Sequence, residues 1–181
     1  MSTTEETEFK ISIAKEKKET GDQAFKTGDL TTALRSYHEA VMYLEGINKS
    51  GAANVPGLGP AITDQSSESK PKSESDELLE KVYSNMAACQ IKKSNWKRAV
   101  DCADKALAKN SANSKALFRK GKALGEMGYF ERADKILSDL LAKDPPDGPA
   151  IKAELDRLRA IDKEREKKHN QKFRGDLACI E

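Results

Sequence analysis

Residues 114–147 read SKALFRKGKALGEMGYFERADKILSDLLAKDPPD. Two runs of helix formers flank a turn at MGYF, and the small residues Gly121 and Ala133 lie inside the two runs. Pro145 and Pro146 end the second run, because proline lacks the amide donor that continues a helix. The segment therefore predicts a hairpin of two helices. Such a hairpin cannot bury its own apolar face, so further copies are expected beside it.

The same pattern occurs twice more upstream. Residues 80–113 directly precede the hairpin and place Ala99 and Ala106 at the offsets of Ala133 and Leu140. In residues 14–47 the matching positions are Gly21, Gly28, Ala33, Tyr37 and Ala40. The second and third units are 34 residues apart, and the first is separated from the second by a 32-residue insertion.

A period of 34 residues with small and large positions in register resembles the tetratricopeptide repeat. The resemblance implies an all-α, right-handed solenoid of three helical hairpins and a C-terminal capping helix. The expected divisions are residues 1–13 (tail and start of the first helix), 14–47, 48–79 (insertion), 80–113, 114–147 and 148–181 (capping helix and tail).

The expected helices span about 8–26, 30–46, 76–93, 96–109, 114–127, 130–143 and 149–170. Ser75 or Asp76 is the expected N-cap of the third helix, and the tail after residue 170 is expected to fray. The last helix has one apolar stripe, formed by Ala150, Ile151, Leu155, Leu158 and Ile161. That stripe can cover the exposed face of the third hairpin, as the end of a solenoid requires.

Residues 48–75 are rich in Gly, Pro and Ser, a composition that favours neither helix nor strand. One interpretation is a flexible surface loop. The other is a docking or regulated loop, since the serines of 66–75 can accept phosphate. The sequence does not decide between these two interpretations.

Composition excludes several classes of function. The formal net charge of +2 is too small to indicate nucleic acid or membrane binding, and no apolar run is long enough to span a bilayer. The polar N-terminus MSTTEETEFK is no secretory signal. The three cysteines Cys89, Cys102 and Cys179 lack metal-ligand spacing, so we expect reduced thiols, no metal or cofactor, and a cytosolic or nuclear location.

The first helices of successive hairpins line the concave face of such a solenoid. Steps of three and four residues place one set of side chains on that face. The set comprises Lys18, Asp22, Asn85, Ala88, Ile91, Lys92, Lys115, Arg119 and Lys122. Several cations and an amide donor together suit an extended peptide that is rich in carboxylates.

This set is similar to the two-carboxylate clamp of tetratricopeptide co-chaperones. Those proteins bind the Glu-Glu-Val-Asp tail of the ninety- and seventy-kilodalton heat-shock chaperones. By this resemblance, Lys18, Asn85, Lys115 and Arg119 match four of the five clamp positions. Ala88 and Ile91 would shape the pocket for the valine of the peptide, and Lys92 and Lys122 would complete the groove wall.

The fifth clamp position differs, because Asp22 stands where the family has Asn. An ionised Asp accepts hydrogen bonds but cannot donate one to a ligand carboxylate. Two unit charges about 4 Å apart repel by about 4 kcal/mol at an effective dielectric of about 20. Lys18, one turn earlier, can pair with Asp22 and reduce this repulsion, but the pair then occupies a clamp cation. The expected affinity loss is roughly 1–3 kcal/mol, which is about tenfold to a few hundredfold.

Two groups of the repeat family are similar to this chain. The segments YSNMAACQIKKSNWKRAVDCADKAL and KALFRKGKAL resemble the large immunophilins. Those proteins have an isomerase domain ahead of their repeats, whereas thirteen residues precede the first unit here, so no such domain is expected. The segment YHEAVMYLEGI, followed by PGLGPAIT, resembles tetratricopeptide-repeat protein nine and its relatives.

Enzymatic and nucleic-acid functions are disfavoured. His38 and His169 are far apart in sequence, and GLGP lacks the lysine and flanking elements of a phosphate loop. The basic segment KEREKKHNQKFR contains acidic residues, which favours a solvated helix over a nucleic-acid site.

The sequence thus predicts a non-catalytic adaptor or co-chaperone that binds the acidic tail of a heat-shock chaperone in its groove. The alternative is a scaffold whose groove takes a different peptide because Asp22 replaces the clamp Asn.

Overall fold

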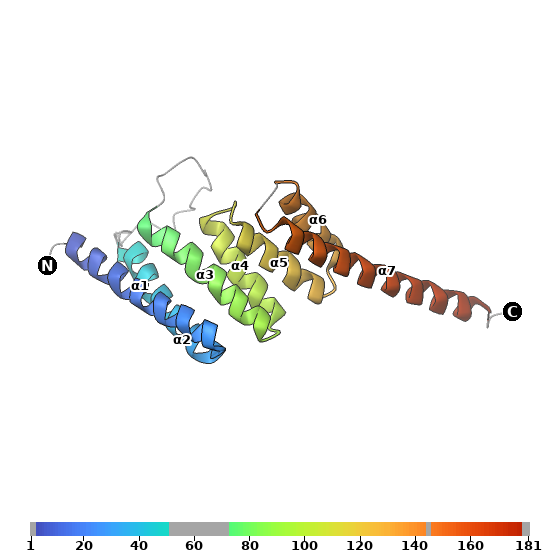
Figure 1. Cartoon of the computed structure of the whole chain (residues 1–181), viewed down its shortest axis with the longest axis horizontal. Coiled ribbons are helices and arrows are strands. Elements are labelled where there is room, and N and C mark those ends of the chain that lie inside the picture. Colours follow the sequence, from blue (N-terminus) through green and yellow to red (C-terminus); the bar gives the residue numbers. More distant parts are fainter. Residues whose placement is uncertain (1–2, 51–72, 144–145, 179–181) are drawn as a thin grey trace, which may run out of the picture.

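The computed structural model describes residues 3–50, 73–143 and 146–178, and every regular element in these ranges is an α-helix. The helices are α1 (Thr3–Thr27), α2 (Leu30–Ser50), α3 (Glu74–Lys92), α4 (Trp96–Lys109), α5 (Ser114–Glu126), α6 (Phe130–Leu141) and α7 (Gly148–Ala178). Figure 1 shows them following one another along the long axis of the molecule. The all-α prediction is confirmed.

The helices form three hairpins and a final helix that packs on the third hairpin. α1 packs on α2, α3 on α4, and α5 on α6. The first helices of the hairpins also contact one another, α1 with α3 and α3 with α5, and α7 contacts both α5 and α6. A continuous inner layer of α1, α3, α5 and α7 results (Figure 1). The first and second hairpins pack directly together through α2 and α3, although the insertion separates them in sequence.

The turn inside each hairpin has a residue in the left-handed region at the same repeat position. Gly28 and Gly128 adopt φ values of 87° and 82°, and Ser94 adopts 56° in the second hairpin. Glycine has no Cβ and takes this conformation without steric cost. The recurrence of the conformation in all three hairpins supports the repeat register.

A second recurring position brings the two helices of a hairpin into close contact. A Cβ added to Gly21 would lie 2.6 Å from the ring of Tyr37, and one added to Gly121 would lie 2.7 Å from Leu137. In the second hairpin the equivalent residues are Ala87 and Ala103, both fully buried. Each hairpin thus fills the same space between its two helices with a different pair of side chains: Gly with Tyr, Ala with Ala, and Gly with Leu.

Several helix ends differ from the predicted ones. α1 begins at Thr3 rather than near residue 8, and Glu5 and Glu6 in its first turn favour the positive end of the helix. α2 continues to Ser50, four residues past its predicted end at Gly46. Both helices extend into segments that contain neither Gly nor Pro, so nothing in the chain ends them earlier.

The third helix begins two residues before its predicted start. Ser73, not Ser75 or Asp76, is the N-cap, and its hydroxyl accepts a hydrogen bond from the backbone N–H of Asp76 at 3.2 Å. The last six residues of the predicted 48–79 insertion, 74–79, are therefore helical. Residues 51–72, the centre of that insertion, lie outside the described residues, and so do the serines of 66–72 that phosphate was expected to modify.

The last helix covers the third hairpin, as predicted, but it is longer than expected. Ile151, Leu155 and Leu158 are buried against apolar residues of α5 and α6. Ile161, the last member of the predicted stripe, is 42 % exposed and does not belong to the core. α7 runs on to Ala178, and residues 163–171 are all exposed, so the distal half projects beyond the hairpins (Figure 1).

Candidate functional site

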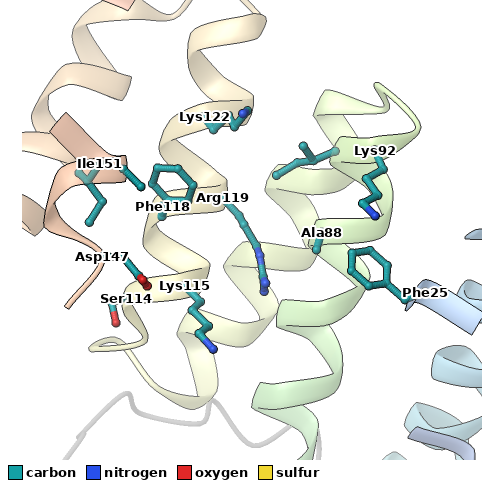
Figure 2. A pocket seen from close by; sticks show the side chains of 12 residues that line it. Phe25, Ala88, Lys92, Ser114, Lys115, Phe118, Arg119, Lys122, Asp147 and Ile151 are labelled. Atoms are coloured by element: carbon teal, nitrogen blue, oxygen red, sulfur yellow. The ribbon is translucent and has the colours of Figure 1, made fainter. Parts of the chain in front are cut away.

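The inner helices enclose a cavity of about 360 Å³ on one side of the solenoid. α3 forms one wall, α5 and the first turn of α7 form the other, and a single residue of α1 completes the end (Figure 2). The lining residues are Phe25, Ala88, Ile91, Lys92, Ser114, Lys115, Phe118, Arg119, Lys122, Asp147, Ala150 and Ile151. The site is therefore an apolar pocket with cations along its rim.

The nine residues expected on the concave face divide into two groups. Six of them line the cavity: Ala88, Ile91, Lys92, Lys115, Arg119 and Lys122. The remaining three, Lys18, Asp22 and Asn85, do not line it. Lys18 and Asn85 each donate a hydrogen bond to Asp22. The two groups meet on α3, where Ser84 contacts Arg119 and the next residue, Asn85, contacts Asp22.

Arg119 is held in place by the backbone and side chain of α3. Its Nη1 donates to the carbonyl oxygen of Ser84 at 2.7 Å and to Ser84 Oγ at 2.6 Å. Burial lowers the pKa of the guanidinium, which remains charged at neutral pH. In the described ranges no carboxylate forms an ion pair with Arg119, although Asp147 lies on the same cavity. Among the residues that the structure describes, Arg119 is thus a half-buried cation without an ion-pair partner.

Lys115 lies one turn before Arg119 on α5 and is exposed. It too has no ion-pair partner among the residues that the structure describes. Figure 2 shows Lys115 and Arg119 on successive turns, with both side chains reaching into the space between α5 and α3. Two cations at this spacing can both bind one carboxylate.

The other two cations of the cavity wall have partners inside the protein. Lys92 lies over the ring of Phe25, with Nζ 4.1 Å from the ring centroid, which joins α3 to α1 by a cation–π contact. Lys122 lies 3.7 Å from Glu154, a buried carboxylate of α7 that also pairs with Arg157. These two lysines are therefore less available to a ligand than Lys115 and Arg119.

Asp22 accepts hydrogen bonds from three different helices. Lys18 Nζ donates to Oδ2 at 2.6 Å, and Tyr37 OH and Asn85 Nδ2 donate to Oδ1 at 2.6 Å and 2.9 Å. The pairing of Lys18 with Asp22, expected from their spacing, is confirmed. This network joins α1, α2 and α3 around one carboxylate.

The hydrogen bonds to Asp22 keep its carboxyl group ionised. Burial alone would raise the pKa of its carboxyl group, but the bonds from Lys18, Tyr37 and Asn85 outweigh burial, and the pKa lies below its ordinary value. Burial and the bond to Asp22 raise the pKa of Tyr37, which therefore stays a neutral donor. At neutral pH Asp22 is therefore ionised, and the protonated hydroxyl of Tyr37 donates a hydrogen bond to it.

We expect the Asp22→Asn variant to be less sensitive to acid than the unchanged protein. Because the folded-state pKa of Asp22 is lowered, its ionised form adds stability above the unfolded value of about 3.9, and this is lost as pH falls through the folded pKa. The difference in unfolding free energy between the two proteins should therefore shrink as pH falls from about 5 towards 2. Urea unfolding at a series of pH values measures it.

The matched control is Asp139→Asn, which alters an exposed carboxylate on the outer helix α6. Its stability should follow that of the unchanged protein over the same pH range. If Asp22→Asn also runs parallel to the unchanged protein, the three donors do not stabilise the ionised form of Asp22.

Sequence reasoning missed two kinds of site residue. Phe25 follows Lys18 by seven residues, a helical spacing that could have placed both on one face. Ala150 and Ile151 come from α7, and only their expected packing on the third hairpin could have indicated them. Tyr37 and Ser84 hold Asp22 and Arg119 from other helices, so no local sequence signal identifies them as partners.

The described residues give little support for other chemistry. Burial raises the pKa of the Cys89 thiol to about 11, so this buried thiol is neutral at pH 7. Within the described ranges, no three His, Cys, Asp or Glu side chains lie close enough to hold a metal ion. None of the helices there has a segment long and apolar enough to cross a membrane.

No protein-family model matches the sequence, but its structure is similar to several solved domains. The C-terminal tetratricopeptide-repeat (TPR) domain of a Plasmodium falciparum FK506-binding protein is similar over 89 % of this chain and 95 % of that domain, with 23 % identity and a TM-score of 0.69. The Hsp90 co-chaperone Cns1 from Saccharomyces cerevisiae is similar over 92 % of this chain and 44 % of its own, with 20 % identity and a TM-score of 0.70.

A third structure contains a bound peptide. The first TPR domain of Spaghetti (RPAP3), solved with the HSP90 peptide SRMEEVD, is similar over 83 % of this chain and 96 % of that domain, with 18 % identity and a TM-score of 0.60. At these identities the similarity establishes the fold. The chain is an all-α solenoid of the TPR type, similar in structure to TPR domains of co-chaperones.

Proposed function

We propose that this protein is a non-catalytic adaptor whose groove binds the acidic C-terminal tail of a heat-shock chaperone of the ninety- or seventy-kilodalton class. The observation that carries the proposal is the pair formed by Lys115 and Arg119, two cations at the rim of an apolar cavity that form no ion pair with any carboxylate in the described part of the chain. A domain of the same fold binds a peptide that ends in Glu-Glu-Val-Asp, which supports this ligand class.

The pocket has the chemistry that such a peptide needs. A ligand carboxylate can accept charge-assisted hydrogen bonds from Lys115 and Arg119, each worth about 1.5–3 kcal/mol. Ala88, Ile91 and Phe118 provide an apolar wall for the valine side chain beside it. Binding of this kind requires no metal or cofactor. An adaptor for such tails would act in the cytosol or nucleus, as the cysteine content also favours.

Titration calorimetry with a short peptide ending in Glu-Glu-Val-Asp tests the proposal. The unchanged chain should bind with a Kd in the micromolar range, and Lys115→Ala should weaken binding about tenfold or more, because it removes one of the two cations proposed to bind the ligand carboxylate. Binding should also weaken as salt is raised, since Lys115 is exposed.

Lys120→Ala is the matched control. Lys120 lies on the same helix and pairs with Asp104 of α4 at 2.6 Å, and it does not line the cavity. The control should bind like the unchanged chain. Equal weakening in both variants would show that net charge alone attracts the peptide, and the absence of any binding would refute the proposed ligand.

A further inference from the structure

Asp22 occupies the place that a ligand carboxylate would need. Lys18 and Asn85 are the two donors of α1 and α3 that the co-chaperone resemblance assigns to a ligand, and both already donate to Asp22. The side chains of Lys18 and Asp22 are only 23 % and 22 % exposed, so their ion pair is largely withdrawn from solvent. A second carboxylate entering here would meet the charge of Asp22 where water screens it poorly.

The carboxylate of Asp22 cannot move aside without loss. Tyr37 is fully buried, and Asp22 is the acceptor for its hydroxyl. The ring of Tyr37 is confined as well, because it packs against Gly21 so closely that an added Cβ would lie 2.6 Å from it. If Asp22 turned away to admit a ligand carboxylate, the phenol would lose its acceptor in a buried position, which is unfavourable.

Asp22 can still accept one more hydrogen bond. A carboxylate has about four acceptor sites, and Lys18, Tyr37 and Asn85 fill three of them. The free site suits an N–H donor of the ligand. Lys115 and Arg119, on the other side of α3, remain the place for a carboxylate.

We propose that the groove holds its ligand by a side-chain carboxylate at Lys115 and Arg119 and by an N–H donor at Asp22, and not by a free terminal carboxylate. The ligand is then an acidic segment with an apolar side chain for the cavity. In a chaperone tail, the terminal carboxylate then makes no bond to the protein, and a backbone amide of the tail supplies the donor to Asp22. This inference rests on the proposed function and specifies which part of an acidic peptide the groove recognises.

Two peptides that differ only at the C-terminus test this inference by titration calorimetry. Both have the sequence Glu-Glu-Val-Asp at the end, one with a free acid and the other with a carboxamide. The salt concentration is set to about 0.3 M so that distant charges are screened. The unchanged chain should bind the carboxamide at least as tightly as the acid.

Asp22→Asn should reverse this order. An Asn side chain can donate to a terminal carboxylate, so the variant should bind the free acid about tenfold or more tightly than the unchanged chain does, and prefer it to the carboxamide. Circular dichroism of both proteins verifies that the variant is folded. Asn also keeps an acceptor for Tyr37, so the fold should be retained.

The outcomes separate this inference from the proposed function. If the unchanged chain prefers the free acid, or if Asp22→Asn shows no reversal, the inference is wrong, whereas the proposed function stands as long as Lys115→Ala weakens binding of both peptides. If the unchanged chain binds neither peptide, both the inference and the proposed function are wrong.

Discussion

Gly121→Ala is expected to lower the free energy of unfolding by about 1–3 kcal/mol, although alanine is the better helix former. The added Cβ would lie 2.7 Å from Cγ and Cδ2 of Leu137. Leu137 is fully buried on α6, so it can yield to the added Cβ only by shifting against its core neighbours. Urea unfolding followed by circular dichroism measures the loss.

Gly46→Ala is the matched control, since it makes the same change inside another helix. Apart from its chain neighbours and its own helix backbone, a Cβ at Gly46 would meet no atom of the described residues within 4 Å. This variant should gain about 0.5–1 kcal/mol from helix propensity alone. If the same Gly→Ala change lowers the free energy of unfolding at residue 121 and raises it at residue 46, the loss at Gly121 is due to packing and not to the helix backbone.

A second variant tests the contact between residues 121 and 137 directly. Leu137→Ala removes a buried side chain and should cost about 2–5 kcal/mol. In the Leu137→Ala background, Gly121→Ala should no longer destabilise, because alanine at both positions reproduces the arrangement of Ala87 and Ala103 in the second hairpin. If Gly121→Ala destabilises equally in both backgrounds, its effect does not arise from contact with Leu137.

The contact between Gly121 and Leu137 also shows why the fold could be predicted from sequence. The equivalent pairs of facing residues in the three hairpins recur 34 residues apart once the insertion is removed, and both members of a pair belong to the same helix–turn–helix unit. The helix ends were less predictable. Ser73, Ser75 and Asp76 can each cap a helix by residue type, and only the geometry of the bond between Ser73 and Asp76 identifies the cap.

The candidate site was predictable only in part. The ion pair of Lys18 and Asp22 follows from their spacing on one helix, and the structure contains it. The bonds from Tyr37 and Asn85 to the same carboxylate join residues 15 and 63 positions away, and only the packing of three helices brings them together. The sequence thus indicated which residues share the concave face, but not that Lys18 and Asn85 donate to Asp22 while Lys115 and Arg119 line the cavity.

Arg119→Met is expected to reduce binding of the Glu-Glu-Val-Asp peptide about thirtyfold to a few thousandfold and yet to stabilise the fold. The loss of binding follows from removing a half-buried charge that would contact the ligand carboxylate directly, an effect of about 2–5 kcal/mol. Calorimetry with the free-acid peptide measures the binding, and thermal unfolding measures the stability.

The gain in stability follows from the surroundings of Arg119. Burial lowers its pKa and no described carboxylate pairs with it, so the folded state carries the desolvation of a charge without a compensating ion pair. A methionine of similar length removes that cost, and Ser84 Oγ can turn to a backbone carbonyl of its own helix. The expected gain is about 1 kcal/mol, the size typical of a single stabilising substitution.

Arg98→Met, an exposed position on the outer helix α4, is the matched control and should leave both binding and stability nearly unchanged, within about 0.5 kcal/mol. A marked loss of stability in Arg119→Met would mean that its bonds to Ser84 outweigh the desolvation, and that Arg119 chiefly joins α5 to α3. A gain in stability together with lost binding would mean that the fold maintains an unpaired cation at this position for the ligand.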